Sequence, residues 1–157
     1  MNKLRQITRR KFFSRFLYSL LTLQIGYLFI RVLKPGKSMA TQKPMYEAGQ
    51  LSFFEKGRVY PFSSENFFLY CLDDGGFLAL SSKCTHLGCT VQYQAGRGLF
   101  ECPCHASAFS KNGEVLSPPA TRALDYFPVK IKDQKVWVDT NTPKRRNQSD
   151  PSQITYA

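Results

Sequence analysis

The longest apolar run of the chain lies near its N-terminus. No charge interrupts residues 16–30. Extending the run to Phe12 and Leu33 gives a helix about 33 Å long at 1.5 Å per residue, enough to cross the hydrocarbon core of a bilayer. We therefore expect one transmembrane helix over residues 12–33, retained as an anchor. A cleaved signal peptide ending near Ser38-Met39-Ala40 is the alternative.

The pattern changes after residue 50. Short apolar segments alternate with turns such as Asp73-Asp74-Gly75-Gly76, and no amphipathic helix pattern competes, so we predict an all-β domain over residues 51–140. We expect Trp137 in its core and Cys71 as a buried free thiol. The expected strands are residues 59–62, 67–72, 77–81, 90–93, 99–101, 114–116, 126–132 and 135–138.

Two polar segments flank this domain. Residues 34–50 contain Pro35, Gly36, Pro44 and Gly49 among polar residues, which is typical of a linker. Residues 141–157 form a polar, basic tail that we expect to be disordered.

The net charge of +11 suggests a nucleic-acid partner at first. The distribution of this charge along the chain argues against a nucleic-acid partner. Residues 1–40 hold nine Lys or Arg and no acid, residues 41–140 hold ten of each sign, and residues 141–157 hold three bases and Asp150. The globular part is therefore neutral, and no nucleic-acid partner is expected.

Basic residues are concentrated on the N-terminal side of the apolar run. Six lie in residues 1–15, a bias that predicts a cytoplasmic flank over residues 1–11 and a domain on the periplasmic or outer side. Arg9-Arg10 ahead of Phe12 also resembles a twin-arginine export signal, with a plain anchor flank as the alternative. The outer side is an oxidising compartment in which disulfides persist.

Both histidines and four of the five cysteines fall in two short loops. Residues 84–89 read CTHLGC, and residues 102–107 read CPCHAS. A tetrahedral zinc site could use two Cys and two His, but it leaves two cysteines unexplained. Two disulfides would leave both histidines without a role. A 2Fe-2S cluster with two Cys on one iron and two His on the other fits the pattern better.

These loops resemble those of Rieske iron-sulfur proteins of the cytochrome bc complex type. The resemblance implies a Rieske-type antiparallel β-sandwich with a small cluster-binding subdomain at about residues 83–120. It implies that Cys84 and Cys102 ligate the inner iron of one 2Fe-2S cluster. His86 and His105 would ligate the outer iron, and a disulfide between Cys89 and Cys104 would join the loops.

The resemblance also gives roles to neighbouring residues. Leu87 resembles the residue that docks at a quinol pocket, and Ser107 resembles the serine that bonds a bridging sulfide. Residues 117–120 resemble a proline loop that shields the cluster, although Ser117 stands where glycine is usual. Phe109 departs from a frequent tyrosine, and Ala106 departs from glycine.

The implied function is electron transfer in a quinol:cytochrome c or plastocyanin oxidoreductase of a plasma or thylakoid-like membrane, with no catalysis by this chain alone. His86 or His105 would accept a hydrogen bond from quinol at cytochrome b, and one electron would pass to a c-type cytochrome or plastocyanin. Residues 34–50 would act as a hinge, with a passive tether as the alternative, and lipid would surround the anchor. The alternatives are a Rieske small subunit of an exported oxidase such as arsenite oxidase, and a binding module without enzymatic function.

Overall fold

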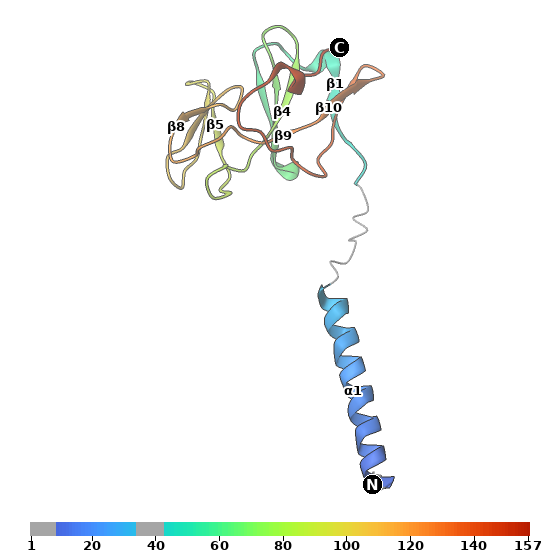
Figure 1. Cartoon of the computed structure of the whole chain (residues 1–157). Coiled ribbons are helices and arrows are strands. Elements are labelled where there is room, and N and C mark those ends of the chain that lie inside the picture. Colours follow the sequence, from blue (N-terminus) through green and yellow to red (C-terminus); the bar gives the residue numbers. More distant parts are fainter. Residues whose placement is uncertain (1–8, 34–42) are drawn as a thin grey trace. The chain divides into compact units, whose positions relative to one another are not determined.

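The computed structural model describes residues 9–33 and 43–157 (Figure 1). The chain divides into two units, Met1–Thr41 and Gln42–Ala157. The first holds the helix α1, and the second holds every strand that the structure describes.

Helix α1 runs over Arg9–Leu33, three residues longer at its N-terminal end than the segment expected from residue 12. Every side chain from Arg9 to Val32 is exposed, and the helix is long and apolar enough to cross a membrane. Its serine and threonine hydroxyls pair with backbone carbonyls of the helix itself; for example, Ser19 donates to the Phe16 carbonyl (2.7 Å) and Thr22 to the Ser19 carbonyl (2.9 Å). A helix in lipid needs this internal pairing because no water is available there.

The second unit consists of three antiparallel sheets. Figure 1 shows strands β5 and β8 of the third sheet set apart from the strands of the other two. Sheet 1 has the order β1 (Tyr46–Gln50), β11 (Lys135–Val138), β10 (Val129–Lys132). Sheet 2 has the order β2 (Val59–Phe62), β3 (Phe67–Cys71), β4 (Phe77–Ser81), β9 (Tyr126–Phe127). Sheet 3 has the order β5 (Gln92–Gln94), β6 (Leu99–Glu101), β7 (Ala108–Ser110), β8 (Val115–Ser117).

Sheet 2 is covered on both faces. All residues of β3 and β4 are buried. Because successive side chains of a strand point to opposite faces, Phe67 and Leu69 enter the core shared with sheet 1, and Phe68 and Tyr70 enter the core shared with sheet 3. Cys84 and Cys102 belong to the core that sheet 2 shares with sheet 3. Their loops therefore pack against one face of sheet 2.

The all-β prediction is confirmed: residues 43–157 form strands and three short 3₁₀ turns, Leu51–Phe53, Ser63–Glu65 and Pro151–Gln153. Four strands have the predicted bounds, and three others differ by one or two residues. Strand β7 was not predicted. The single strand expected over residues 126–132 is interrupted at Pro128, which has no backbone N–H to donate to a neighbouring strand.

The predicted linker over residues 34–50 is wrong in its last part, because residues 46–50 are strand β1. This strand pairs only with β11 and shifts register between Glu47 and Gly49. An edge strand with a bulge tolerates glycine and polar residues. The composition of β1 is therefore similar to that of a linker. Residues 34–42 lie outside the described part of the chain.

The core position predicted for Trp137 is also wrong. Val136 and Val138 are fully buried, and Trp137 between them is only half-buried, on the opposite face of β11 beside Lys130 and Glu47 of the neighbouring strands. Cys71 is a buried free thiol, as predicted.

The prediction of a disordered tail over residues 141–157 is wrong. Lys144 pairs with Tyr126 through two backbone hydrogen bonds of 2.7 and 3.1 Å, and Thr155 pairs in the same way with Phe77 at 2.8 and 3.0 Å. Between them the Arg146 side chain is 5% exposed. It donates to the Leu124 carbonyl (2.6 Å), to the Asn112 carbonyl and to the side chain of Gln153 (2.6 Å). Hydrogen bonds hold this segment, and Ile154 packs against the core that contains Cys84 and Cys102.

Replacing Arg146 by Met is expected to destabilise the second unit by about 3 kcal/mol, because three buried or half-buried acceptors lose their donor. Denaturant unfolding in detergent, followed by fluorescence of the single tryptophan, measures the loss. Arg145→Met is the matched control, since Arg145 is exposed, and we expect a change below about 0.5 kcal/mol there. An equal decrease in the free energy of unfolding in the two variants would contradict the role assigned to Arg146.

Candidate metal centre

The two cysteine- and histidine-containing loops have the same backbone design. Loop 1 is residues 84–89, shortly after β4, and loop 2 is residues 102–107, between β6 and β7. Each is closed by hydrogen bonds from its first N–H to its sixth carbonyl and from its fifth N–H to its first carbonyl. The four bonds are Cys84 to Cys89 (2.7 Å), Gly88 to Cys84 (2.9 Å), Cys102 to Ser107 (2.8 Å) and Ala106 to Cys102 (3.0 Å).

The fifth position of each loop has a left-handed backbone. Gly88 has φ +79° and Ala106 has φ +58°. Glycine adopts this conformation freely, whereas a side chain with a Cβ is strained there by about 1–2 kcal/mol. The departure from glycine noted at Ala106 therefore falls at the one position of loop 2 where glycine is favoured by the backbone.

Ala106→Gly is expected to stabilise the second unit by about 0.5–1 kcal/mol, the relief of strain less the extra backbone entropy of glycine. Thermal unfolding of the two proteins measures the difference. Ala95→Gly, in an exposed turn without positive φ, is the control and should be neutral or destabilising. Destabilisation by Ala106→Gly would show that the loop does not need the left-handed conformation.

The four predicted ligands form two pairs, two buried sulfurs and two imidazoles at the surface. Cys84 and Cys102 are 3% and 2% exposed. Burial raises the pKa of the Cys84 thiol, while hydrogen bonds from the His86 backbone and the Ser107 side chain favour its thiolate. The rings of His86 and His105 lie at the surface with centroids 5.0 Å apart and planes at 88°.

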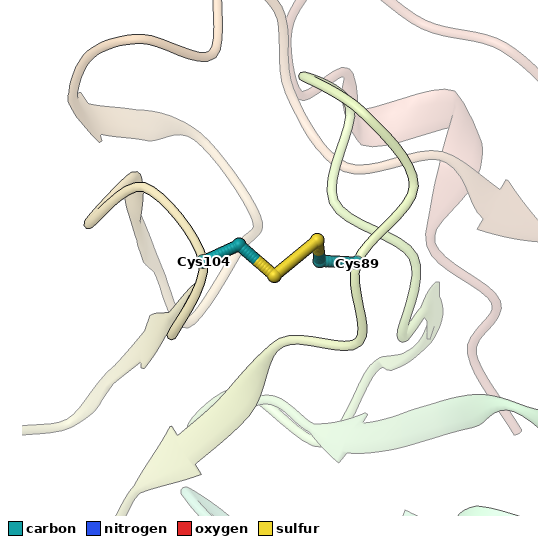
Figure 2. Close-up of a disulfide and its surroundings, with 2 residues drawn as sticks. All are labelled: Cys89 and Cys104. Atoms are coloured by element: carbon teal, nitrogen blue, oxygen red, sulfur yellow. A yellow bond between two sulfur atoms is a disulfide. The ribbon is translucent and has the colours of Figure 1, made fainter.

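This donor set fits a 2Fe-2S cluster. Two neighbouring buried thiols suit the iron that faces the core, and two neighbouring imidazoles suit an iron near the surface. The predicted disulfide is present between Cys89 and Cys104 and joins the two loops (Figure 2). It accounts for the two cysteines that a zinc site would leave unexplained.

The segment after β8 supports both loops. The hydroxyl of Ser107, which is fully buried, accepts a hydrogen bond from the Ala120 N–H (3.0 Å). The Thr85 hydroxyl donates to the Arg122 carbonyl (2.7 Å). Neither Thr85 nor Arg122 is recognisable from sequence as part of the site, because one contributes only a hydroxyl and the other only a backbone carbonyl.

Two further predicted residues occupy opposite environments. Leu87 is 69% exposed at loop 1, so it has no role in the core. Phe109 is fully buried, opposite Phe100 in the β6–β7 pairing and in the same core as Cys84 and Cys102.

Phe109→Tyr is expected to raise the midpoint potential of the cluster by about 40 mV, the equivalent of one net hydrogen bond of about 1 kcal/mol in a one-electron couple. A hydroxyl that bonds a ligating sulfur stabilises the more negative reduced state. Potentiometric titration of both proteins measures the shift. An unchanged or lower potential would show that the ring does not face a ligating sulfur.

Comparison with known proteins gives one family. The model of the Rieske [2Fe-2S] domain matches residues 44–128. The cytochrome b6-f complex iron-sulfur subunit of Synechococcus sp. (strain JA-3-3Ab) is 41% identical over 70 residues, which cover 43% of this chain and 41% of that protein. The subunit of the same name from Chlorobaculum tepidum is 35% identical over 83 residues, covering 52% and 45%. The chain thus spans less than half the length of either relative.

A solved chain of a hyperthermophilic respiratory Complex III is 26% identical, with a TM-score of 0.49 over 76% of this chain and 93% of that one. The family match extends over more than half of the chain and contains both loops, the buried thiols and the paired imidazoles. The chain therefore belongs to the Rieske [2Fe-2S] domain family.

Proposed function

We propose that this chain is the electron-transfer subunit of a membrane-bound quinol:cytochrome c or plastocyanin oxidoreductase. Cys84 and Cys102 hold the inner iron of its 2Fe-2S cluster, and His86 and His105 hold the outer iron. The observation that carries this proposal is the pair of surface imidazoles, with ring centroids 5.0 Å apart, in the same two loops as two buried thiols.

The ligands set the chemistry of the site. When bound, the cluster takes up one electron at a higher potential than an all-cysteine cluster, because two neutral imidazoles replace two thiolates. Each imidazole binds metal through one nitrogen and can hold a proton, or accept a hydrogen bond, at the other. His86 and His105 thereby receive the hydroxyl of a quinol, while the buried thiols keep water from the inner side of the site.

The N-terminal region provides the membrane anchor. Helix α1 spans the membrane over residues 12–33, with residues 1–11 as the cytoplasmic flank, and the twin-arginine pair directs export of a folded domain. The lysine and arginine bias toward residues 1–15 supports this orientation. The segment between α1 and β1 serves as the tether in this proposal. The Rieske domain, which includes β1 and the paired tail, lies on the periplasmic or outer side.

The partners are cytochrome b, which presents the quinol, and a c-type cytochrome or plastocyanin, which takes the electron. Exposed Leu87 contacts the quinol pocket of cytochrome b. The names of the two bacterial relatives support a place in such a complex. Nothing in the comparisons favours the exported-oxidase alternative. The chain alone has no turnover in this proposal, because both the quinol pocket and the acceptor belong to other subunits.

Purification of the tagged chain from its native membranes in mild detergent tests the proposal. We expect a di-haem cytochrome b and a c-type cytochrome to accompany it, and we expect the chain to keep its N-terminal segment. Recovery of a cleaved, soluble chain without a cytochrome b would overturn the proposal.

A further inference from the structure

Three sulfur atoms gather where the two loops meet. The Sγ atoms of Cys89, Cys102 and Cys104 all lie within 4.8 Å of one another. Cys89 and Cys104 share the disulfide, whereas Cys102 is a free thiol. A free thiol this close to a disulfide needs only a small movement to attack it, which is the arrangement that thiol–disulfide exchange requires.

We propose that Cys102 exchanges with the disulfide whenever the cluster does not hold it. The Cys102 thiol loses its proton, and the thiolate attacks Sγ of Cys89. The Cys89–Cys104 bond breaks as a Cys89–Cys102 bond forms, and Cys104 leaves as a thiolate that takes up a proton. One disulfide and one thiol stand on each side of this step, so it needs no oxidant or reductant. The inference rests on the proposed role of Cys102 as a ligand.

The surroundings of the three sulfurs select Cys89 as the point of attack. Attack on Cys104 would close a small ring across Pro103, whose φ is fixed by its own ring, whereas attack on Cys89 closes a longer loop. Cys104 is exposed, and Cys89 packs against the same core that contains Cys102. The leaving thiolate is therefore formed at the position where water can solvate it, and the new disulfide lies on the core side of the loops.

The exchange would remove a proposed ligand from the cluster-free chain. With Cys102 in a disulfide, the buried pair of thiols is reduced to Cys84 alone, and the site no longer offers two sulfurs to one iron. Cluster binding must then precede oxidation of the loops. Such an order suits a domain that receives its cluster before it reaches an oxidising compartment.

Disulfide mapping of the full-length chain in detergent tests the inference. The cluster is removed with a chelator at acidic pH, the chain is held without oxygen at neutral to mildly alkaline pH, and free thiols are alkylated before peptide mass spectrometry. We expect most chains to carry a Cys89–Cys102 disulfide with Cys104 alkylated, at an unchanged total of free thiols. A Cys89–Cys104 disulfide that persists, with Cys102 alkylated, would overturn the inference.

Matched variants separate the nucleophile from loss of the cluster. Cys84→Ser and Cys102→Ser each remove one proposed ligand, but only Cys84→Ser keeps the attacking sulfur. We expect the exchanged disulfide in Cys84→Ser and the original one in Cys102→Ser. If neither variant shows the exchanged disulfide, the inference is overturned. Cys71→Ser, which removes the buried free thiol of the other core, should behave as the parent does.

The cluster-loaded parent distinguishes this inference from the proposed ligand set. If Cys102 holds iron, the loaded chain keeps its Cys89–Cys104 disulfide under the conditions in which the stripped chain exchanges. Equal exchange in loaded and stripped chains would leave the exchange chemistry intact and reject Cys102 as a ligand.

Discussion

Replacement of either His86 or His105 by cysteine is expected to lower the midpoint potential of the cluster by several hundred millivolts. Clusters with two histidine ligands have potentials of roughly −150 to +300 mV, against about −400 mV for plant-type all-cysteine clusters. A thiolate adds a negative charge next to iron and opposes uptake of an electron. The two imidazoles lie together at the surface, so we expect a substantial part of this shift from each single replacement.

Potentiometric titration followed by EPR measures this effect, and the EPR signal typical of an iron held by two histidines should disappear with it. Ala95→Cys is the control, because it adds a cysteine in an exposed turn while both histidines stay in place. We expect the potential of that variant to equal that of the parent. An unchanged spectrum in both histidine variants would reject the assignment of these residues.

Removal of the disulfide is the second change with a large expected effect. Cys89 and Cys104 are separated by 15 residues, and a disulfide that closes a loop of about this length contributes about 3 kcal/mol in the chain-entropy account. Without it the two loops, which hold two ligands each, separate more easily. About 1.4 kcal/mol corresponds to a tenfold change in an equilibrium constant. The fraction of chains in which the two loops have separated therefore rises on the order of 100-fold.

The double variant Cys89→Ser/Cys104→Ser should therefore lose its visible cluster absorption much faster than the parent at one elevated temperature. We also expect a lower potential, because water reaches the cluster more readily. Cys71→Ser is the matched control, since it removes a buried thiol from the core that contains neither Cys84 nor Cys102. The same half-life and potential in the double variant and the parent would show that the disulfide does not hold the loops together.

The chemistry of the site could be predicted from sequence because it depends on residue type and short spacing. Two loops with one Cys, one His and one further Cys each admit few metal centres, and local turns fix the backbone of each loop. Strands that form short apolar runs between turns, such as 59–62 and 77–81, were predictable for the same reason: their signal is local.

The missed features depend on partners that are distant in sequence. Strand β1 and the tail are held by backbone hydrogen bonds to β11, Tyr126 and Phe77, which almost any residue can make. The hydrogen bonds that Thr85 and Ser107 make with the segment after β8 likewise exist only once the sheets have assembled. Trp137 is different: its outward position follows from strict alternation with Val136 and Val138, which is a local pattern.

Pulsed EPR of the reduced cluster, in a chain labelled with ¹⁵N at histidine only, tests the central claim most directly. The chain has two histidines, so nitrogen couplings from two imidazoles should appear, and His86→Cys or His105→Cys should each leave one. A spectrum without histidine nitrogen coupling, or one that both variants leave unchanged, would contradict ligation by His86 and His105.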